Sequence, residues 1–505
     1  MNVDRSRFLS TNILIIIVFM ITAVLTYLTV LNTAPIADDY GHLTRVARIP
    51  ASELWRLFTL QSPIFIRPLP FLQIWIFYRI FGMEWLPTHI VNVLMHGGTG
   101  FLLYWFLKKI GISMTASLLA ASLFLLTPFA SEAVSWPAGR FDVWCLLFMI
   151  LSLGLYINAI RSESRIAFAG SMVLALGALF SKETSMILVV LFPALELLFV
   201  FYPSKIAEWK TIVRSDAFRQ TIFRLLVFFF IFAVYIAIRY AIMGRLGNYR
   251  NASLFSMPSL EGSGKTMFTL LAPLDALEVS NSVIIALRAY TGALLTTSLL
   301  FVALRWKHAS ITARRAWLFS VVFFVSSLLL VFQSAFVDGI SNYLNNSRFF
   351  YIPMAGFYGM LVIGLLEFGW RNTIWRSAAI ISLTALIPVF IWGVNMNNQA
   401  WIYAARIGTE IADETYMLLP DPPPESKIYI DNIPKGWGGH LLGAGTKQAL
   451  RLKYNRSDLI FGYSHPLMNL KPVENTEDGF LLRYDWETGL LTLVHTPAGI
   501  TSVTQ

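Results

Sequence analysis

The feature that most constrains the fold is the repetition of long apolar runs through about the first 395 of the 505 residues. A helical run of about eighteen residues or more can cross the roughly 30 Å hydrocarbon core of a bilayer. Only 13% of the residues are charged, against about a quarter in soluble proteins. The sequence therefore predicts an α-helical polytopic membrane protein. We expect about eleven spans, at residues 9–31, 87–107, 113–130, 143–160, 166–181, 185–203, 221–241, 283–304, 317–336, 350–367 and 377–395.

Short basic clusters occupy alternate gaps between these runs. They are Arg5/Arg7, Lys108/Lys109, Arg161/Arg165, Lys205 to Arg219, Arg305 to Arg315, and Arg371/Arg376. If the N-terminus is cytoplasmic, all six clusters lie in the cytoplasm, as the positive-inside rule requires. This placement accounts for the net charge of +10, so we expect no nucleic-acid partner. An odd number of spans then puts the C-terminus outside the cytoplasm.

The first outer loop contains an apolar stretch from Pro68 to Met83, with Trp75, Tyr78 and Arg79 interspersed. Aromatic and basic residues in this arrangement favour an interfacial helix that lies on the bilayer. The alternative is a full span, which would reverse the charge alternation downstream. We therefore expect the interfacial helix.

The sequence changes character near residue 396, where the apolar runs stop. We predict a transmembrane domain at 1–395 and a small extracytoplasmic α/β domain at 396–505. Its expected elements are a strand at 427–430, a helix at 446–454 and a hairpin at 479–494, after the proline-rich segment 420–424. Four aromatic side chains are candidates either for stacking on sugar rings or for the core of this domain: Trp437, Tyr454, Tyr463 and Trp486.

Two adjacent carboxylates, Asp38 and Asp39, follow the first apolar run. Single carboxylates at a membrane boundary are usually solvated loop residues. In a close pair, one carboxylate disfavours ionisation of the other and can tune it as a base. Either aspartate is a candidate for the catalytic base.

The expected outer side also collects unusual polar residues. Glu132, Arg140, Asp142, Lys182, Glu183 and Arg348 all lie there, beside aromatic residues. Ordinary snorkelling and surface pairing would explain any one of them. A concentration of cations on this side runs against the positive-inside bias, however. Arginine and lysine bind phosphate well, so the group predicts a site for an anionic lipid headgroup.

His89, Asn92 and His96 recur on one face of the second span. A metal-binding histidine pair would prefer i, i+4 spacing and further ligands. Hydrogen bonding between helices is the alternative, and we expect it for His96. His89 lies nearer the outer end, where it could reach the aspartates and line a pocket.

Three other chemistries are excluded by the residues present. The segment 259–266 resembles a phosphate-binding loop, but its first glycine is replaced by Ser259. We expect a flexible outer loop there. The lone Cys145 rules out a disulfide within the chain. The outer loops contain no Asp-x-Asp pattern, so we expect no metal and no cofactor.

Several motifs occur in an order that resembles a known family. They are Asp38-Asp39, Phe65-Ile-Arg-Pro-Leu69, Thr88 to His96, Thr127 to Trp136, Gly139-Arg-Phe-Asp142, Ser181-Lys-Glu-Thr184 and Ser347 to Pro353. In this order they resemble the GT-C class of integral-membrane glycosyltransferases. The protein O-mannosyltransferase-like group, which includes transmembrane and tetratricopeptide-repeat proteins, is the most similar. This chain lacks the tetratricopeptide repeats, which leaves the acceptor open.

The resemblance implies sugar transfer from a polyprenyl-phosphate-linked donor, with the acceptor hydroxyl activated by an acidic residue of the first outer loop. Nucleotide sugars are absent outside the cytoplasm, so the donor must be lipid-borne. On this basis Asp38 or Asp39 is the base. Arg348, Lys182 and Arg140 would bind the donor phosphate, oriented by Glu183 and Asp142. The acceptor is an envelope glycan, lipid or protein, and the missing repeats favour a bacterial inner membrane.

Two other functions remain open at this stage. A transporter or flippase of lipid-linked glycans should show paired broken spans and internal repeat symmetry, and the sequence has neither. A non-catalytic scaffold with a partner-binding outer domain predicts that the aspartates are dispensable.

Overall fold

The computed structural model describes residues 2–36, 38–60, 64–202, 212–244, 260–274, 279–332, 340, 344, 346–369, 372–433, 449–456, 458–463 and 479–497. Eight helices in this part of the chain are long and apolar enough to cross a membrane. The bent pair Met114–Leu126 and Pro128–Ser135 makes a ninth span if counted as one, and Thr11–Thr26 and Arg165–Leu179 are shorter apolar helices. The predicted class, an α-helical integral membrane protein, is confirmed.

Each of the eleven predicted ranges falls on one of these helices. They are α1 (Asn2–Thr26), α4 (Leu86–Lys109), α5 (Met114–Leu126), α7 (Arg140–Ser162), α8 (Arg165–Leu179), α9 (Leu188–Glu196), α11 (Asp216–Met243), α13 (Asn281–Arg305), α14 (Ile311–Leu330), α15 (Tyr351–Glu367) and α16 (Thr373–Leu418).

Helix α15 forms the centre of the bundle. In the most apolar stretch of Ser347–Glu367, 89% of the residues are buried. The corresponding stretch of Asn281–His308, at the periphery, has 17%. Small residues allow this packing, since a Cβ atom on Gly356 would lie 2.6 Å from the backbone nitrogen of Phe324 in α14. The core therefore depends on close helix approach.

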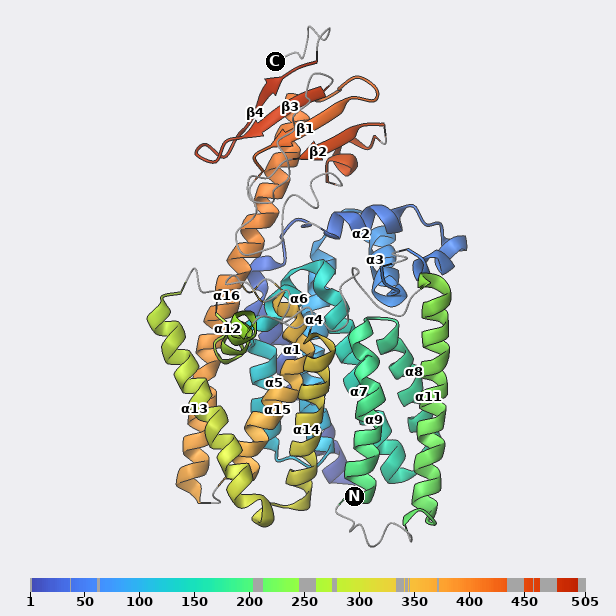
Figure 1. The fold of residues 1–505 in the computed structure, drawn as a ribbon, viewed down its shortest axis with the longest axis vertical. Helices are drawn as coiled ribbons and strands as arrows, with labels where there is room; N and C mark the ends of the chain where they lie inside the picture. The colour runs from blue at the N-terminus through green and yellow to red at the C-terminus, as the bar shows by residue number, and fades with distance from the viewer. Residues whose placement is uncertain are drawn as a thin grey trace.

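The two ends of the bundle differ (Figure 1). The N-terminus lies at one end, and a small sheet lies beyond the other, together with α2 (Asp38–Ala47) and α3 (Pro68–Phe81). Helix α3 has 14 residues, about 21 Å of helix, which is too short to cross 30 Å of hydrocarbon. Its length favours the interfacial helix over the full span.

Helix α16 connects the bundle to the sheet. It has 46 residues, or about 69 Å, so more than half of it extends beyond the hydrocarbon. Asn372 caps its first turn by accepting a hydrogen bond from the Trp375 backbone at 2.8 Å. The helix runs without interruption through residue 396, and the division at that residue stays a prediction.

The C-terminal sheet has the strand order β2-β1-β3-β4. Strand β1 (Lys427–Asp431) is parallel to β2 (Ile460–Tyr463) and to β3 (Gly479–Tyr484), and β4 (Leu491–His495) is antiparallel to β3. The expected first strand and hairpin are confirmed, and residues 449–454 are helical as expected. The short strand β2 was not predicted.

The four aromatic residues proposed for this region differ in their burial and location. Tyr454 is buried and donates its hydroxyl hydrogen to the carbonyl of Leu419 at 2.6 Å, which makes it part of the core. Tyr463 lies in β2, whereas Trp486 is exposed. Trp437 lies outside the described residues. The expectation of a loop at 259–266 is wrong for the described part, because α12 (Leu260–Leu271) begins there.

Candidate functional site

The two adjacent aspartates differ in their exposure to solvent. Both lie in the first turn of α2. Asp38 is exposed, whereas Asp39 is 2% exposed, and its Oδ2 accepts a hydrogen bond from the Ile36 backbone N–H at 3.0 Å. Asp39 is thus the member of the pair that is fixed within the protein.

The surroundings of Asp39 suit a general base. Burial raises the pKa of its carboxyl to about 7, and the negative charge of Asp38 adds to this effect. The Ile36 N–H and the positive charge of Arg140 act in the opposite direction. A group with a pKa near the working pH is the most effective proton acceptor.

A tight turn precedes Arg140, the first residue of α7. The turn Pro137–Gly139 packs against α6 (Ser131–Ser135), and a Cβ atom on Gly139 would lie 2.3 Å from the carbonyl oxygen of Glu132. Only glycine fits where the turn lies this close to the backbone of α6. Arg140 is fully buried and donates from Nε to the Pro137 carbonyl at 2.5 Å.

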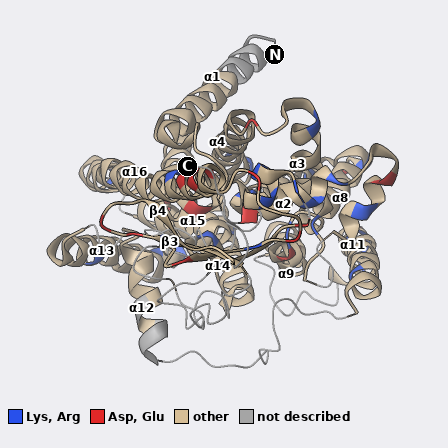
Figure 2. Ribbon diagram, turned by 90° about the horizontal axis from the view of Figure 1, so that it is seen from above, with Lys and Arg blue, Asp and Glu red and all other residues tan. Residues whose placement is uncertain are grey.

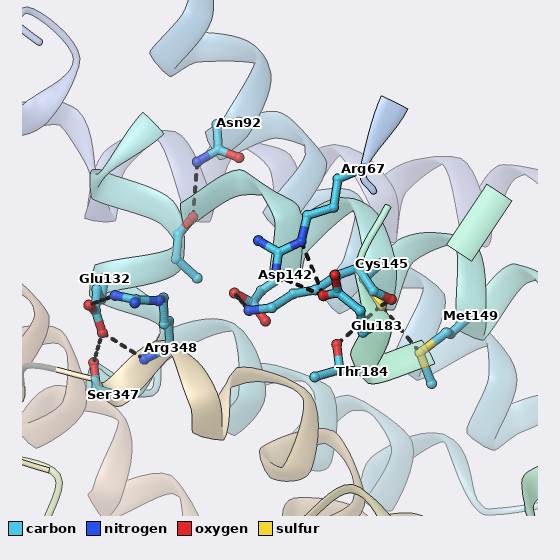
Figure 3. A network of polar contacts seen from close by, with 12 residues as sticks. Arg67, Asn92, Glu132, Asp142, Cys145, Met149, Glu183, Thr184, Ser347 and Arg348 are labelled. Atoms are coloured by element: carbon cyan, nitrogen blue, oxygen red, sulfur yellow. Dashed lines mark hydrogen bonds and ion pairs between the residues drawn. The ribbon is translucent and has the colours of Figure 1, made fainter. Parts of the chain in front are cut away.

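The buried Glu132 pairs with the partly buried Arg348 (Figure 3). The Arg348 guanidinium donates to one carboxylate oxygen of Glu132, and the Arg348 backbone N–H donates to the other at 2.9 Å. The guanidinium carbon lies 5.1 Å from the centre of the Trp136 ring and 5.0 Å from that of Phe349. These contacts hold the arginine over an aromatic surface.

A second pair joins Lys182 to Asp142, with 2.5 Å between Nζ and Oδ2. Burial lowers the pKa of Lys182, and the positive charges of Arg67 and Arg348 add to this effect, while Asp142 opposes it. The two pairs therefore belong to one electrostatic cluster.

Glu183 has partners that the sequence did not predict. It accepts from Arg67 at 2.8 Å and from Arg239 at 3.3 Å, and Figure 3 shows Arg67 directed at it. It does not pair with Lys182, Arg140 or Arg348, which we expected it to orient.

Two signals could have identified these partners. Arg67 belongs to one of the family-like motifs, and Arg239 is an ionisable residue inside an apolar run, which marks a functional position.

His89 lies beside the aspartate segment without bonding to either aspartate. Among the described residues, its Nε2 contacts the Thr33 hydroxyl and carbonyl oxygens, both at 3.2 Å. His96 contacts the Tyr351 hydroxyl and the Leu125 carbonyl, both at 2.8 Å, in agreement with a structural role between helices. Asn92 likewise bonds to the Val134 carbonyl at 2.7 Å.

The buried and partly buried side chains of the cluster, without the exposed Asp38, have an excess of positive charge. Its cations are Arg67, Arg140, Lys182, Arg239 and Arg348, and its carboxylates are Asp39, Glu132, Asp142 and Glu183. Five cations against four ionised carboxylates leave +1, and protonation of Asp39 leaves +2. Figure 2, viewed from this end, shows basic residues around α2 and α3.

The described residues contain no group of three or more potential metal ligands. A cavity of about 340 Å³ lies at the opposite end of α7, against Glu163, Arg165 and Arg224, away from this cluster.

No family model matches the chain. The human protein O-mannosyl-transferase TMTC4 is 29% identical over 162 residues, covering 28% of this chain and only 22% of that protein. This match confirms the resemblance predicted from the ordered motifs.

Two proteins of known structure are also similar. ArnT from Cupriavidus metallidurans, in the apo state and bound to undecaprenyl phosphate, gives TM-scores of 0.40 and 0.38 at 11% and 12% identity, covering 88% of this chain and 85% of ArnT. The apo oligosaccharyltransferase of Archaeoglobus fulgidus gives 0.47 at 12% identity, covering 90% of this chain and 65% of that enzyme.

Proposed function

We propose that this chain is an inverting glycosyltransferase that moves a sugar from a polyprenyl-phosphate-linked donor to a hydroxyl group of an envelope glycan, lipid or protein. The observation that carries the proposal is Asp39, a buried carboxylate with a pKa of about 7 beside a cation-rich cluster. The partial match to a protein O-mannosyl-transferase supports the same class of reaction.

One carboxylate is sufficient for this reaction. The acceptor oxygen forms a bond to the anomeric carbon while Asp39 takes the hydroxyl proton. The bond from the anomeric carbon to the phosphate oxygen breaks, and its electron pair leaves with the polyprenyl phosphate. A single displacement inverts the anomeric centre. The leaving phosphate is stabilised by nearby cations, so no strong general acid is needed.

Arg348 is the cation that we assign to the first contact with the donor phosphate. Its side chain is 20% exposed, compared with 7% for Lys182 and 1% for Arg239. In this assignment Glu132 orients Arg348, Asp142 orients Lys182, and Arg140 acts between the phosphate and Asp39. His89 supports the Thr33 segment beside them.

The proposal includes an orientation. The N-terminus lies in the cytoplasm, and the catalytic cluster and the C-terminal domain lie outside it, on a bacterial inner membrane. The support is the alternation of basic clusters and the need for a lipid-borne donor where nucleotide sugars are absent.

The test is transfer by the purified protein in lipid nanodiscs. Radiolabelled polyprenyl-phosphate sugars, mannose first, are incubated with envelope extract, with and without EDTA. We expect transfer by the wild-type protein and transfer at least about 100-fold slower by Asp39→Asn. Transfer should persist in EDTA, because the cluster neutralises the phosphate, and strict dependence on an added divalent metal would contradict this arrangement. No transfer from any donor would instead favour a flippase or a scaffold.

A further inference from the structure

Trp136 joins the two halves of the candidate site. It lies between α6 and the turn Pro137–Gly139, and it is buried. Its indole Nε1–H donates a hydrogen bond to the Ile36 carbonyl at 3.2 Å. The same carbonyl accepts from the Asp39 backbone N–H at 3.0 Å.

Ile36 also holds the Asp39 side chain. Its own N–H donates to the Asp39 carboxylate at 3.0 Å. The indole is therefore one hydrogen bond from the residue that binds both the backbone and the carboxylate of Asp39. A buried indole N–H usually finds an acceptor, and here the acceptor belongs to the residue that also holds the Asp39 carboxylate.

The ring of Trp136 is fixed by two neighbours. The Arg348 guanidinium lies 5.1 Å from its centre. Trp401 of α16 is nearly parallel to it, with 5.8 Å between ring centres and 12° between planes. Movement of Arg348 or α16 would therefore be transmitted to the Ile36 carbonyl.

We propose that Trp136 is a positioning residue that holds the Asp39 carboxylate in place through Ile36 and couples it to Arg348 and α16. The inference rests on the proposed function of Asp39 as the base. It adds a requirement: the donor-phosphate side and the base side of the site share one indole ring.

The proposal has a consequence for pH dependence. The charged and titratable groups that act on Asp39 are Arg140, Asp38 and Tyr40. Without the indole hydrogen bond, the Ile36 segment relaxes and its N–H no longer stabilises the ionised carboxylate. The pKa of Asp39 then rises, and the acid limb of the transfer rate moves to higher pH by roughly half to one unit.

The test is Trp136→Phe, which keeps an aromatic ring and removes the donor. We expect kcat at pH 7 to fall by about tenfold to a hundredfold with little change in KM for the donor, and part of the loss to be recovered at pH 9. Trp144→Phe is the matched control, because it removes an indole hydrogen bond that runs from α7 to Gln73 of α3 and does not involve Ile36. It should leave the pH profile unchanged.

A second readout does not depend on transfer. The infrared carboxyl band that is present in the wild-type protein and lost in Asp39→Asn should titrate at higher pH in Trp136→Phe. An unchanged titration of this band, or a loss of rate that is uniform across pH, would overturn the proposal. Absence of transfer by the wild-type protein would count against the proposed function alone, because the band still reports on Trp136.

If Trp136→Phe does not fold, 3-benzothienylalanine at position 136 replaces it. This side chain keeps the shape of the indole and lacks the N–H, so the same shift is expected. A band that titrates as in the wild-type protein would again overturn the proposal.

Discussion

Asp38 and Asp39 differ only in their surroundings, and this difference predicts their roles. Asp39 is buried beside Arg140, whereas Asp38 is exposed. We expect Asp39→Asn to lower kcat by about 100- to 10,000-fold, the range for loss of a general base, without changing donor affinity. Asp38→Asn is the matched control and should stay within about threefold of the wild-type rate. Equal rates for all three proteins would show that neither carboxylate is the base.

The same burial predicts how stability depends on pH. The pKa of Asp39 is about 7 in the folded protein and about 3.9 in an unfolded chain. The folded state therefore holds its proton more tightly. Its contribution to stability is complete below about pH 4, declines as the pH rises, and is lost above about pH 7.

Asp39→Asn removes this dependence. In detergent, its apparent melting temperature should exceed that of the wild-type protein at pH 8, by an amount corresponding to a few kcal/mol, and the two should converge towards pH 4. A gap that stays the same at both pH values would contradict a raised pKa.

At the scale of elements, Arg348 joins the start of α15 to α6 and is the most exposed of the paired cations in the cluster. We expect Arg348→Ala to weaken donor binding roughly ten- to a hundredfold, which corresponds to the loss of a charge-assisted hydrogen bond. The measurement is binding of a labelled polyprenyl-phosphate sugar. Arg406→Ala, at an exposed arginine of α16, should bind donor like the wild-type protein. Identical affinities for both variants would exclude Arg348 from the donor site.

Glu183 connects three separate segments through Arg67 and Arg239. Glu183→Gln removes the negative charge that Glu183 presents to two buried arginines, and we expect a loss of about 3–5 kcal/mol. The comparison is Glu53→Gln, which breaks an exposed pair with Arg56 and should cost less than about 1 kcal/mol. The measurement is the melting temperature of both variants in detergent, relative to the wild-type protein. Equal melting temperatures would mean that the Glu183 pairs do not stabilise the bundle.

The sequence predicted spans well because each is a long local pattern. It predicted pairings poorly because they join distant positions: Glu183 lies 116 residues from Arg67, and Glu132 lies 216 from Arg348. The pair of aspartates was recognisable in the sequence. That Asp39 is buried and Asp38 exposed depends on packing between distant segments, which no local pattern contains. Strand β2 has only four residues, including a glycine, and its pairing with β1 is also long-range.

At the scale of the whole molecule, α16 links the membrane bundle, the candidate site and the C-terminal sheet. Asn397 and Asn398 bond to residues near the site, including Ser135 of α6 at 2.6 Å from Asn398. Further along the helix, the apolar core of the C-terminal sheet packs against Tyr40, the residue after Asp39. The apolar core of the C-terminal sheet thus contacts the same short helix, α2, that carries the proposed base.

This arrangement predicts different results for two truncations. Removal of everything after Leu419 deletes the sheet but keeps Trp401, which stacks on Trp136. Removal after Asn398 also deletes Trp401. We expect both truncated proteins to bind donor, because Arg348 and its partners remain, and both to lose transfer to the native acceptor.

The distinguishing measurement is hydrolysis of the donor, in which water replaces the acceptor. The protein cut after Leu419 should hydrolyse donor within about threefold of the wild-type rate, and the protein cut after Asn398 should be at least about tenfold slower, because the Trp136 ring loses its support. Equal rates of donor hydrolysis by the two truncated proteins would show that the contact between Trp401 and Trp136 does not affect Asp39. Normal transfer to the native acceptor by either truncated protein would show that the C-terminal sheet does not select the acceptor.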